Sequence, residues 1–209
     1  MVTAVGCSPT FRGFESHPPL FFKMKKVYLV HGWEGSPSSE LWFKWLKQEL
    51  LEMNIKIDIL EMPHPKKPEI GEWVSYLMKT VKEIDEETYF VGHSIGCQAI
   101  MRYLEKLPES TEIAGCVFVA GWFNLKEESY EGEEDREIAK PWIETPISFE
   151  KIKDHTGNFL AIFSKDDPNV PVSDSELFKE RLGAKIILKD DEEHFEETKE
   201  IPEILEFIK

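Results

Sequence analysis

The sequence predicts an α/β fold with a six-stranded, mostly parallel sheet and helices on both of its faces. Short apolar runs rich in β-formers alternate along the chain with amphipathic helical patterns. Residues 113–120 form a near-continuous apolar run, which is typical of a parallel strand buried on both sides. A Gly-x-Ser-x-Gly pentad, residues 92–96, lies between another such run and a helical pattern. Strand, sharp turn and helix are the context in which this pentad has chemical meaning.

The length of 209 residues suits one domain with a substantial core, which we expect to span residues 24–209. Residues 1–23 carry Gly, Pro, Ser and Arg without helical or alternating periodicity. They also lack the apolar core and cleavage site of a signal peptide. We therefore expect a non-native or disordered extension there; a native mobile arm is the alternative.

Charge and cysteine content exclude several classes of protein. The formal charge of −15 is concentrated in residues 127–137 and 190–200, which argues against nucleic acid or an anionic membrane as partner. No apolar run reaches the length of a membrane span. The three cysteines have neither metal-site nor disulfide-framework spacing, so the sequence predicts a reducing, cytoplasmic compartment. A protein partner is possible, but nothing indicates one.

The remaining elements follow from the same patterns. The expected strands are residues 27–30, 55–60, 88–92, 113–120, 159–164 and 185–188. Helices are expected over residues 39–53, 70–84, 149–155 and 201–208. Two further helices are expected, one from the pentad to before Pro108 and one that ends at Leu182. Ser39 is the expected cap of the first helix. Pro171 is expected to open the helix that ends at Leu182.

Residues 121–147 interrupt the alternation. They carry many acidic side chains and several aromatic ones but few strand signals. Because they follow the fourth expected strand, their start should lie above the carboxyl end of the sheet. We predict a small lid or substrate-binding insertion; a solvated excursion pinned to the body by its aromatic residues is an equal alternative.

The pentad predicts a nucleophile elbow with Ser94 at its tip. Gly92 and Gly96 are small because strand and helix cross tightly there, and the strained turn exposes the serine hydroxyl. In the alternative, Ser94 is the N-cap of an ordinary turn. A serine nucleophile needs a base, itself oriented by a carboxylate.

Candidate partners follow later strands, because ligands of such sheets lie outside the carboxyl ends of the strands. Asp167 comes after the fifth expected strand and His194 after the sixth. The order Ser, Asp, His is that of α/β-hydrolases. Asp166 competes with Asp167 but is expected to be solvated or to cap a turn.

The other histidines are less well placed. His17 lies in the N-terminal segment, His64 in a Pro-rich loop and His155 at a helix end beneath the fifth strand. His93 is expected to point away from Ser94. His194 therefore remains as the candidate base.

An oxyanion hole needs two N–H donors near the nucleophile. The candidates are the backbone N–H groups of Ile95, which follows Ser94, and Trp33, in the loop after the first strand. His31 and Trp122 are candidate substrate-binding residues, although His31 is expected chiefly to organise its loop. No metal ligands, metal or organic cofactor are expected.

From about residue 24 onward the chain resembles a family. It is similar to the small serine hydrolases of the α/β-hydrolase superfamily that include retinoblastoma-binding protein 9 and YdeN. The resemblance rests on Val-Tyr-Leu-Val-His-Gly-Trp, Trp-Phe-Lys-Trp-Leu, Gly-His-Ser-Ile-Gly-Cys, Ser-Lys-Asp-Asp-Pro-Asn-Val-Pro and the closing His-Phe. It implies a compact α/β-hydrolase with a triad of Ser94, Asp167 and His194. One departure is Glu193, where relatives usually have glycine.

These residues predict a carboxylesterase-like serine hydrolase. It would cleave a small-molecule acyl ester, or a related acyl substrate, through an acyl-enzyme. The alternative from another class is a hydrolase-fold protein-binding module whose triad is vestigial.

Overall fold

A single parallel sheet organises residues 23–209, which are the residues that the computed structural model describes. The expected extension, apart from Lys23, lies outside the described residues. The sheet order is β2-β1-β3-β4-β5-β6, and each neighbouring pair is parallel. This confirms the predicted fold class. The strands are β1 (Lys26–Val30), β2 (Lys56–Leu60), β3 (Thr88–His93), β4 (Gly115–Val119), β5 (Phe159–Ser164) and β6 (Lys185–Lys189).

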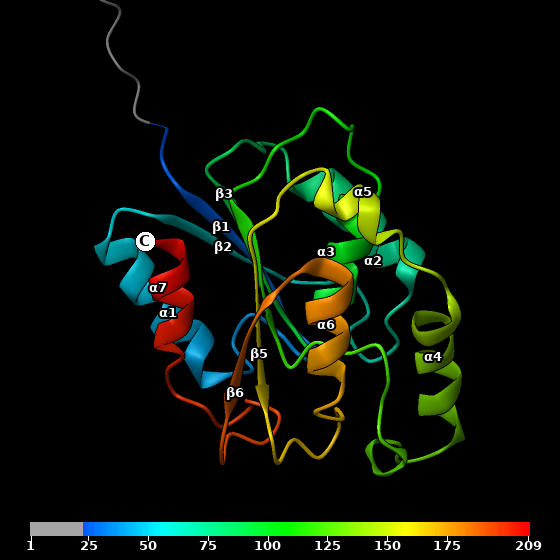
Figure 1. Ribbon diagram of the computed structural model, residues 1–209. Coiled ribbons are helices and arrows are strands. Elements are labelled where there is room, and N and C mark those ends of the chain that lie inside the picture. Colours follow the sequence, from blue (N-terminus) through cyan, green and yellow to red (C-terminus); the bar gives the residue numbers. More distant parts are fainter. Residues whose placement is uncertain (1–22) are drawn as a thin grey trace, which may run out of the picture.

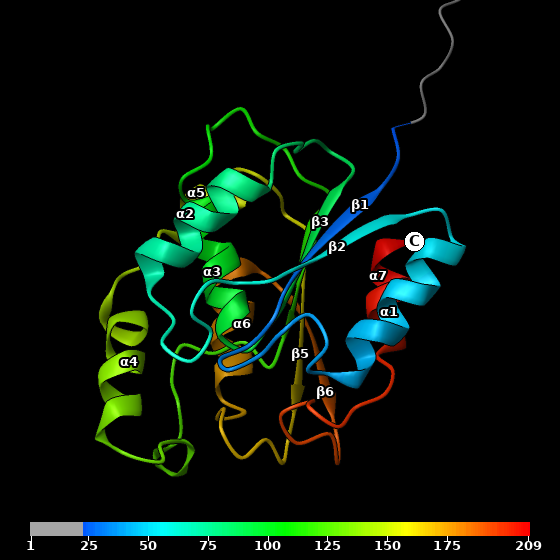
Figure 2. The same cartoon turned by 180° about the vertical axis from the view of Figure 1, so that it is seen from behind.

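Helices cover both faces of the sheet (Figures 1 and 2). One face carries α1 and α7, and the other carries α2, α3, α5 and α6. The helices are α1 (Leu41–Glu52), α2 (Ile70–Thr80), α3 (Ile95–Leu104), α4 (Glu133–Glu144), α5 (Phe149–Lys153), α6 (Asp174–Leu182) and α7 (Pro202–Ile208), with a short 3₁₀ turn η1 (Glu127–Ser129). The fold therefore has three layers.

Each face of the sheet has its own hydrophobic core, because successive side chains of a strand point to opposite faces. In β1, Tyr28 and Val30 join the core beneath α2, α3 and α6. Val27 and Leu29 join the core beneath α1 and α7. Strands β3, β4 and β5 are buried along their whole length, which explains their near-continuous apolar sequences.

The strand order reverses between β1 and β3. From β1 the chain moves outward to β2, and it then returns to place β3 on the other side of β1. Their carboxyl ends are adjacent, with Val30 opposite Gly92. The loop after β1 and the turn after β3 therefore meet at this switch point, where ligands of such sheets bind.

Two expected helix starts are wrong. Helix α1 begins at Leu41 with Glu40 in the cap position, whereas the Ser39 hydroxyl donates to the Ser36 carbonyl. Helix α6 begins at Asp174, after a turn in which the Asp174 N–H bonds to the Pro171 carbonyl over 2.9 Å. In both places, local hydrogen bonds of the loop replace the expected cap.

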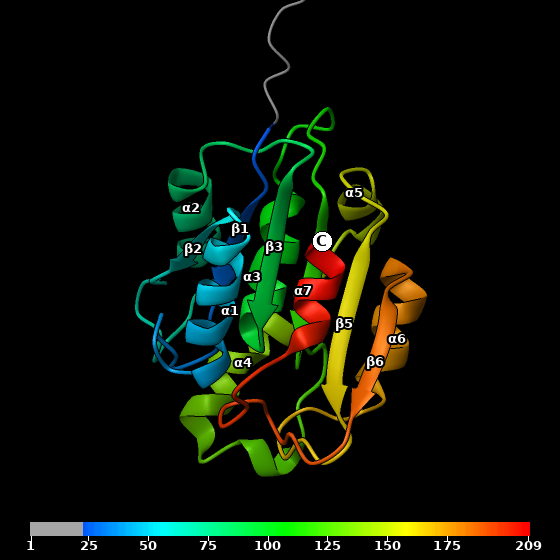
Figure 3. The ribbon, with the colours of Figure 1, turned by 90° about the vertical axis from the view of Figure 1, so that its left-hand side faces the viewer.

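Residues 121–147 are pinned to the body at both ends. Trp122 and Trp142 are almost fully buried. The Trp142 indole donates to the Pro68 carbonyl over 2.9 Å, and the Arg102 guanidinium donates to the Trp142 carbonyl over 2.8 Å. Between these anchors lie η1 and α4, near the end of the sheet to which the strand arrows point (Figure 3). The segment is thus an insertion beside the predicted site.

Substitution of Gly96 should test the tight crossing of β1, β3 and α3. A Cβ at Gly96 would lie 2.4 Å from the Val30 carbonyl oxygen and 2.6 Å from that of His31. We expect Gly96→Ala to lower the free energy of unfolding by about 2–3 kcal/mol.

Gly71→Ala is the matched control for that measurement. No atom lies within 4 Å of a Cβ at Gly71, which is a helical position. Alanine there should stabilise by about 0.5–1 kcal/mol. Urea unfolding of both variants measures the contrast, and equal effects would contradict the close approach.

Candidate active site

Ser94 occupies the turn between β3 and α3 in a strained conformation. Its φ of 51° and ψ of −124° lie outside the regions that non-glycine residues favour. The turn is held by a 2.9 Å hydrogen bond from the Ser94 N–H to the Val119 carbonyl. Although Ser94 is the N-cap residue of α3, its hydroxyl makes no capping hydrogen bond. The hydroxyl is therefore not used to stabilise the helix.

His194 and Asp167 form a buried pair. His194 Nδ1 lies 2.8 Å from Asp167 Oδ2, and both residues are over nine-tenths buried. The other carboxylate oxygen, Oδ1, accepts from the N–H groups of Asn169 and Val170. Asp167 is thus fixed in its turn, and its Oδ2 orients the imidazole of His194 through Nδ1.

Asp166 has a different set of partners. Its carboxylate accepts from the Ser164 hydroxyl and, over 3.3 Å, from the Glu193 N–H. The hydrogen bond from Ser164 holds the pKa of this carboxyl below its usual value, against the opposing effect of desolvation. Of the two candidate acids, the structure brings only Asp167 against His194.

The loop after β1 closely approaches the elbow. A Cβ at Gly32 would lie 3.2 Å from Ser94 Cβ. His31 is buried, with Nδ1 2.8 Å from the Gly32 carbonyl and Nε2 3.0 Å from the Met62 N–H. Because the Met62 N–H must donate, Nε2 accepts and Nδ1 donates. His31 therefore organises the loop and does not line the cavity, whereas Trp33 does.

A cavity of about 280 Å³ opens above Ser94. Ser94, His194, Trp33 and Trp122 all line it. Its volume is at the small end of the range for ligand sites. The structure therefore brings the proposed nucleophile and base, one oxyanion-hole candidate (Trp33) and one substrate-binding candidate (Trp122) to one small cavity.

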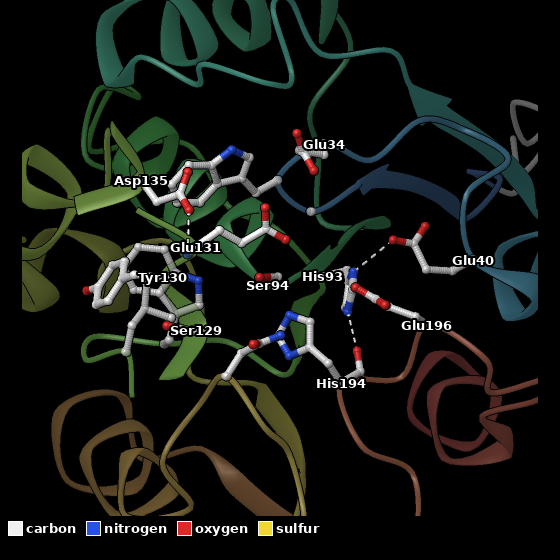
Figure 4. A pocket seen from close by; sticks show the side chains of 15 residues that line it. Glu34, Glu40, His93, Ser94, Ser129, Tyr130, Glu131, Asp135, His194 and Glu196 are labelled. Carbon is white, nitrogen blue, oxygen red and sulfur yellow. Dashed lines mark hydrogen bonds and ion pairs between the residues drawn. The ribbon is translucent and has the colours of Figure 1, made fainter. Parts of the chain in front are cut away.

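Carboxylates dominate the charged lining of this cavity. Figure 4 shows Ser94 among side chains that come from the loop after β1, the insertion and the loop of His194. The acidic ones are Glu34, Glu40, Glu131, Asp135 and Glu196, and no lysine or arginine of residues 23–209 lines the cavity. The local potential should therefore be negative.

Sequence reasoning missed a buried pair beside the three candidate catalytic residues. His93 Nδ1 lies 3.0 Å from Glu40 Oε1, and His93 Nε2 lies 2.8 Å from the His194 carbonyl oxygen. His93 thus faces Glu40 and the His194 backbone while lining the same cavity as Ser94. No local signal marks Glu40, since it lies 53 residues from His93 in the chain.

The loop that carries His194 has an unusual backbone. Asp191, Glu193 and Phe195 have φ values of 58°, 46° and 63°. Glycine adopts this left-handed region at little cost. The conformation at Glu193 gives a physical reason for the glycine expected there from the resemblance, and it shows that this chain accepts the strain.

Three other side chains are buried in the interior of the protein, namely His155, Cys97 and Cys116. His155 bonds to the carbonyls of Thr111 and Leu104. Cys97 and Cys116 are buried, and burial raises the pKa of both thiols, so neither is an activated nucleophile. In residues 23–209, no His, Cys, Asp and Glu side chains are grouped to hold a metal ion. In the same part of the chain, no helix is long and apolar enough to cross a membrane.

Comparison with known proteins decides the family. Residues 27–204 match the family described as serine hydrolase. The chain belongs to this serine hydrolase family. Putative hydrolase YdeN of Bacillus subtilis (strain 168) is 33% identical over 168 residues, which cover 78% of this chain and 81% of YdeN. Serine hydrolase RBBP9 of Rattus norvegicus is 28% identical over 186 residues, or 88% of this chain and 94% of that protein. The predicted family is confirmed.

Two solved structures support the fold. The crystal structure of the YdeN product from B. subtilis superposes with a TM-score of 0.78 at 30% identity, covering 88% of this chain and 96% of YdeN. Est1E from Butyrivibrio proteoclasticus with bound ferulic acid has a TM-score of 0.66 at 12% identity, covering 89% and 87% of the two chains. The second likeness extends to the fold only.

The contacts of the two aspartates predict a sharp difference between matched variants. In Asp167→Asn, the amide oxygen can keep the turn, but the amide nitrogen then faces His194 Nδ1. The imidazole is forced into the wrong tautomer, and we expect kcat for an acyl ester to fall about 10³-fold or more.

Asp166→Asn is the control for that loss. Its amide oxygen can still accept from Ser164 and Glu193, so kcat should stay within about threefold of wild type. Steady-state hydrolysis of an activated ester measures both. A larger loss in Asp166→Asn than in Asp167→Asn would reverse the assignment of the acid.

Proposed function

We propose that the protein is a carboxylesterase-like serine hydrolase that cleaves a small acyl ester through an acyl-enzyme. The observation that carries this proposal is the buried 2.8 Å contact of His194 with Asp167 at the cavity that Ser94 lines. Membership of the serine hydrolase family supports it. The ester bond and the roles of individual residues are the proposed part.

The reaction would proceed in two steps. Ser94 Oγ attacks the acyl carbonyl while His194 Nε2 takes the hydroxyl proton and then gives it to the departing alkoxide. Water then attacks the acyl-enzyme, again with His194 as base, and releases the acid and free Ser94. Asp167 keeps Nδ1 protonated and stabilises the imidazolium that forms in each step. This chemistry needs no metal or organic cofactor.

Two backbone N–H groups are proposed to hold the developing oxyanion. Ile95 is the first residue of α3, so its N–H belongs to the unpaired donors at the positive end of that helix. Trp33 follows Gly32, whose close approach to Ser94 leaves the loop beside the nucleophile. Donors fixed before the reaction stabilise the charge without reorganisation.

The cavity favours a small substrate without negative charge. Trp122 and Leu125 give its lining an apolar part, and the carboxylates give it negative charge. An aromatic acid bound to Est1E is consistent with an acyl group of this size in a protein of the same fold. We therefore propose a neutral or cationic acyl ester; His31, which is buried below the cavity, would act on it only through the loop.

Ester hydrolysis and covalent labelling of Ser94→Ala test the function. Wild type should hydrolyse p-nitrophenyl acetate and butyrate and react with a fluorophosphonate probe. The variant should lose labelling and at least about 10³-fold in kcat/KM, because the nucleophile is gone. Ser110→Ala removes an exposed serine that does not line the cavity, and this variant should retain both activities.

The alternative is a binding module on the same fold with a vestigial triad. A fluorophosphonate distinguishes the two, because it needs an activated serine and not merely a cavity. If wild type neither labels nor turns over, the triad is not functional and the binding alternative takes the place of the esterase.

The acidic lining predicts charge selectivity. We expect kcat/KM for p-nitrophenyl butyrate to exceed that for the mono-p-nitrophenyl ester of succinate by about tenfold or more at low salt. Added salt should bring the two kcat/KM values closer together, because it screens exposed carboxylates.

Glu131→Gln should narrow the same ratio at low salt, since Glu131 lines the cavity. Glu112→Gln changes the net charge equally, but Glu112 is an exposed loop residue that does not line the cavity, so this variant should leave the ratio unchanged. If neither Glu131→Gln nor added salt changes the ratio of the two kcat/KM values, the electrostatic explanation is refuted.

A further inference from the structure

The side chains of Glu40 and His93 are deeply buried, although taking charged groups out of water costs free energy. Their side chains are 5% and 2% exposed. Both oxygens of Glu40 are occupied, one by His93 Nδ1 and the other by the Ser39 hydroxyl. Replacing a buried ion pair by apolar side chains is often neutral or stabilising, so a gain in stability does not explain why this pair is present.

The hydrogen bonds fix the protonation of His93. Its Nε2 faces the His194 carbonyl, which can only accept, so Nε2 donates. Its Nδ1 faces a carboxylate and donates as well. Burial lowers the pKa of His93, but the hydrogen bond and the charge of Glu40 outweigh burial and raise it. His93 is therefore an imidazolium, and the pair is an ion pair with a third, uncharged partner.

Several elements enclose this imidazolium. The rings of Trp42 and Phe43 of α1 lie nearly perpendicular to it, with centroids 6.1 and 6.3 Å away. The ring of His194 lies 5.0 Å away. The charged or titratable groups around it are Glu40, Glu196 and His31 in addition to His194. Among the described residues, a single hydrogen bond connects Glu40 and His93 to the loop of His194, and it is the bond from His93 Nε2 to the His194 carbonyl.

We propose that Glu40 and His93 position His194 relative to Ser94. This inference rests on the proposed esterase function. Asp167 fixes the His194 ring from the turn after β5, whereas His93 fixes its backbone from the end of β3. Because His93 immediately precedes Ser94, the same strand end sets the nucleophile and anchors the base. Glu40 and His93 are positioning residues and take no part in proton transfer.

The His194 loop has need of such an anchor. Its backbone is strained at Asp191, Glu193 and Phe195, and a small displacement of a catalytic group can cost about 10²-fold in rate. The Phe195 N–H bonds to the Glu192 carbonyl within the loop itself. The bond to His93 instead ties the loop to the central strand of the sheet.

Two substitutions of His93 separate positioning from stability. Asparagine places an amide near the position of Nδ1, so His93→Asn can keep a bond to Glu40 but loses the donor to His194. Glutamine places an amide near Nε2, so His93→Gln can keep the donor to His194 but leaves Glu40 with a poorer partner. We expect His93→Gln to be the less stable variant and His93→Asn the slower enzyme.

The measurements are melting temperature and kcat and KM for p-nitrophenyl butyrate, with active sites counted by a fluorophosphonate. Per titrated site, kcat of His93→Asn should fall about 10- to 100-fold with KM within about threefold. In His93→Gln, kcat should fall less. If the variant with the lower melting temperature also has the lower kcat, or if His93→Asn keeps wild-type kcat, the positioning role is refuted.

Replacing the pair by leucines gives a second, independent check. Glu40→Leu with His93→Leu should melt at or above the wild-type temperature while kcat falls as in His93→Asn. A double variant with wild-type kcat per titrated site would overturn the proposal.

The downfield proton NMR signal of His194 Nδ1–H reports the geometry without turnover. It should shift in His93→Asn more than in His93→Gln. Ester hydrolysis by wild type tests the esterase function separately: a wild type without turnover or labelling refutes the esterase, while an unshifted signal in His93→Asn refutes the positioning role.

Discussion

The close packing of β3, α3 and β1 is the constraint on which the site depends. Gly92 and Gly96 leave no room for a Cβ, the nearest clashes being with the Cys97 N–H and the Val30 carbonyl. Because α3 lies so close to the sheet, the connecting residue Ser94 takes a conformation that non-glycine residues rarely adopt. That conformation presents its side chain at the switch point of the sheet, where the loops after β1, β5 and β6 converge.

Local chemistry explains why much of the fold was predictable from sequence. Buried parallel strands and amphipathic helices produce distinct hydrophobic patterns in the sequence. The glycines at residues 92 and 96 indicate a close approach of strand and helix that a side chain would prevent. The contact between Asp167 and His194 was predictable because both residues follow strands, whose carboxyl ends lie at one edge of the sheet; their catalytic roles stay a proposal. Glu40 was not, since its role depends on a contact with His93 across 53 residues. Helix α4 was also missed as a helix, because its sequence is highly charged and contains a proline.

Electrostatics divide the cavity into an ordered interior and an acidic entrance. Inside, the buried side chains are held in two hydrogen-bonded pairs: His194 with Asp167, and His93 with Glu40. At the entrance, Glu131 and other carboxylates of the lining face solvent. Paired buried charges fix geometry, whereas exposed ones select among substrates by long-range attraction and repulsion. The same residue type thus acts in two ways, according to its access to water.

The order of the proposed catalytic residues along the chain has a consequence for biosynthesis. Ser94 is translated before Asp167, and His194 comes later still, in the loop after the edge strand β6. A ribosome-bound chain can therefore expose Ser94 while His194 is still inside the exit tunnel. Under the proposed mechanism, Ser94 is not activated until the loop of His194 has been synthesised and has docked beside it.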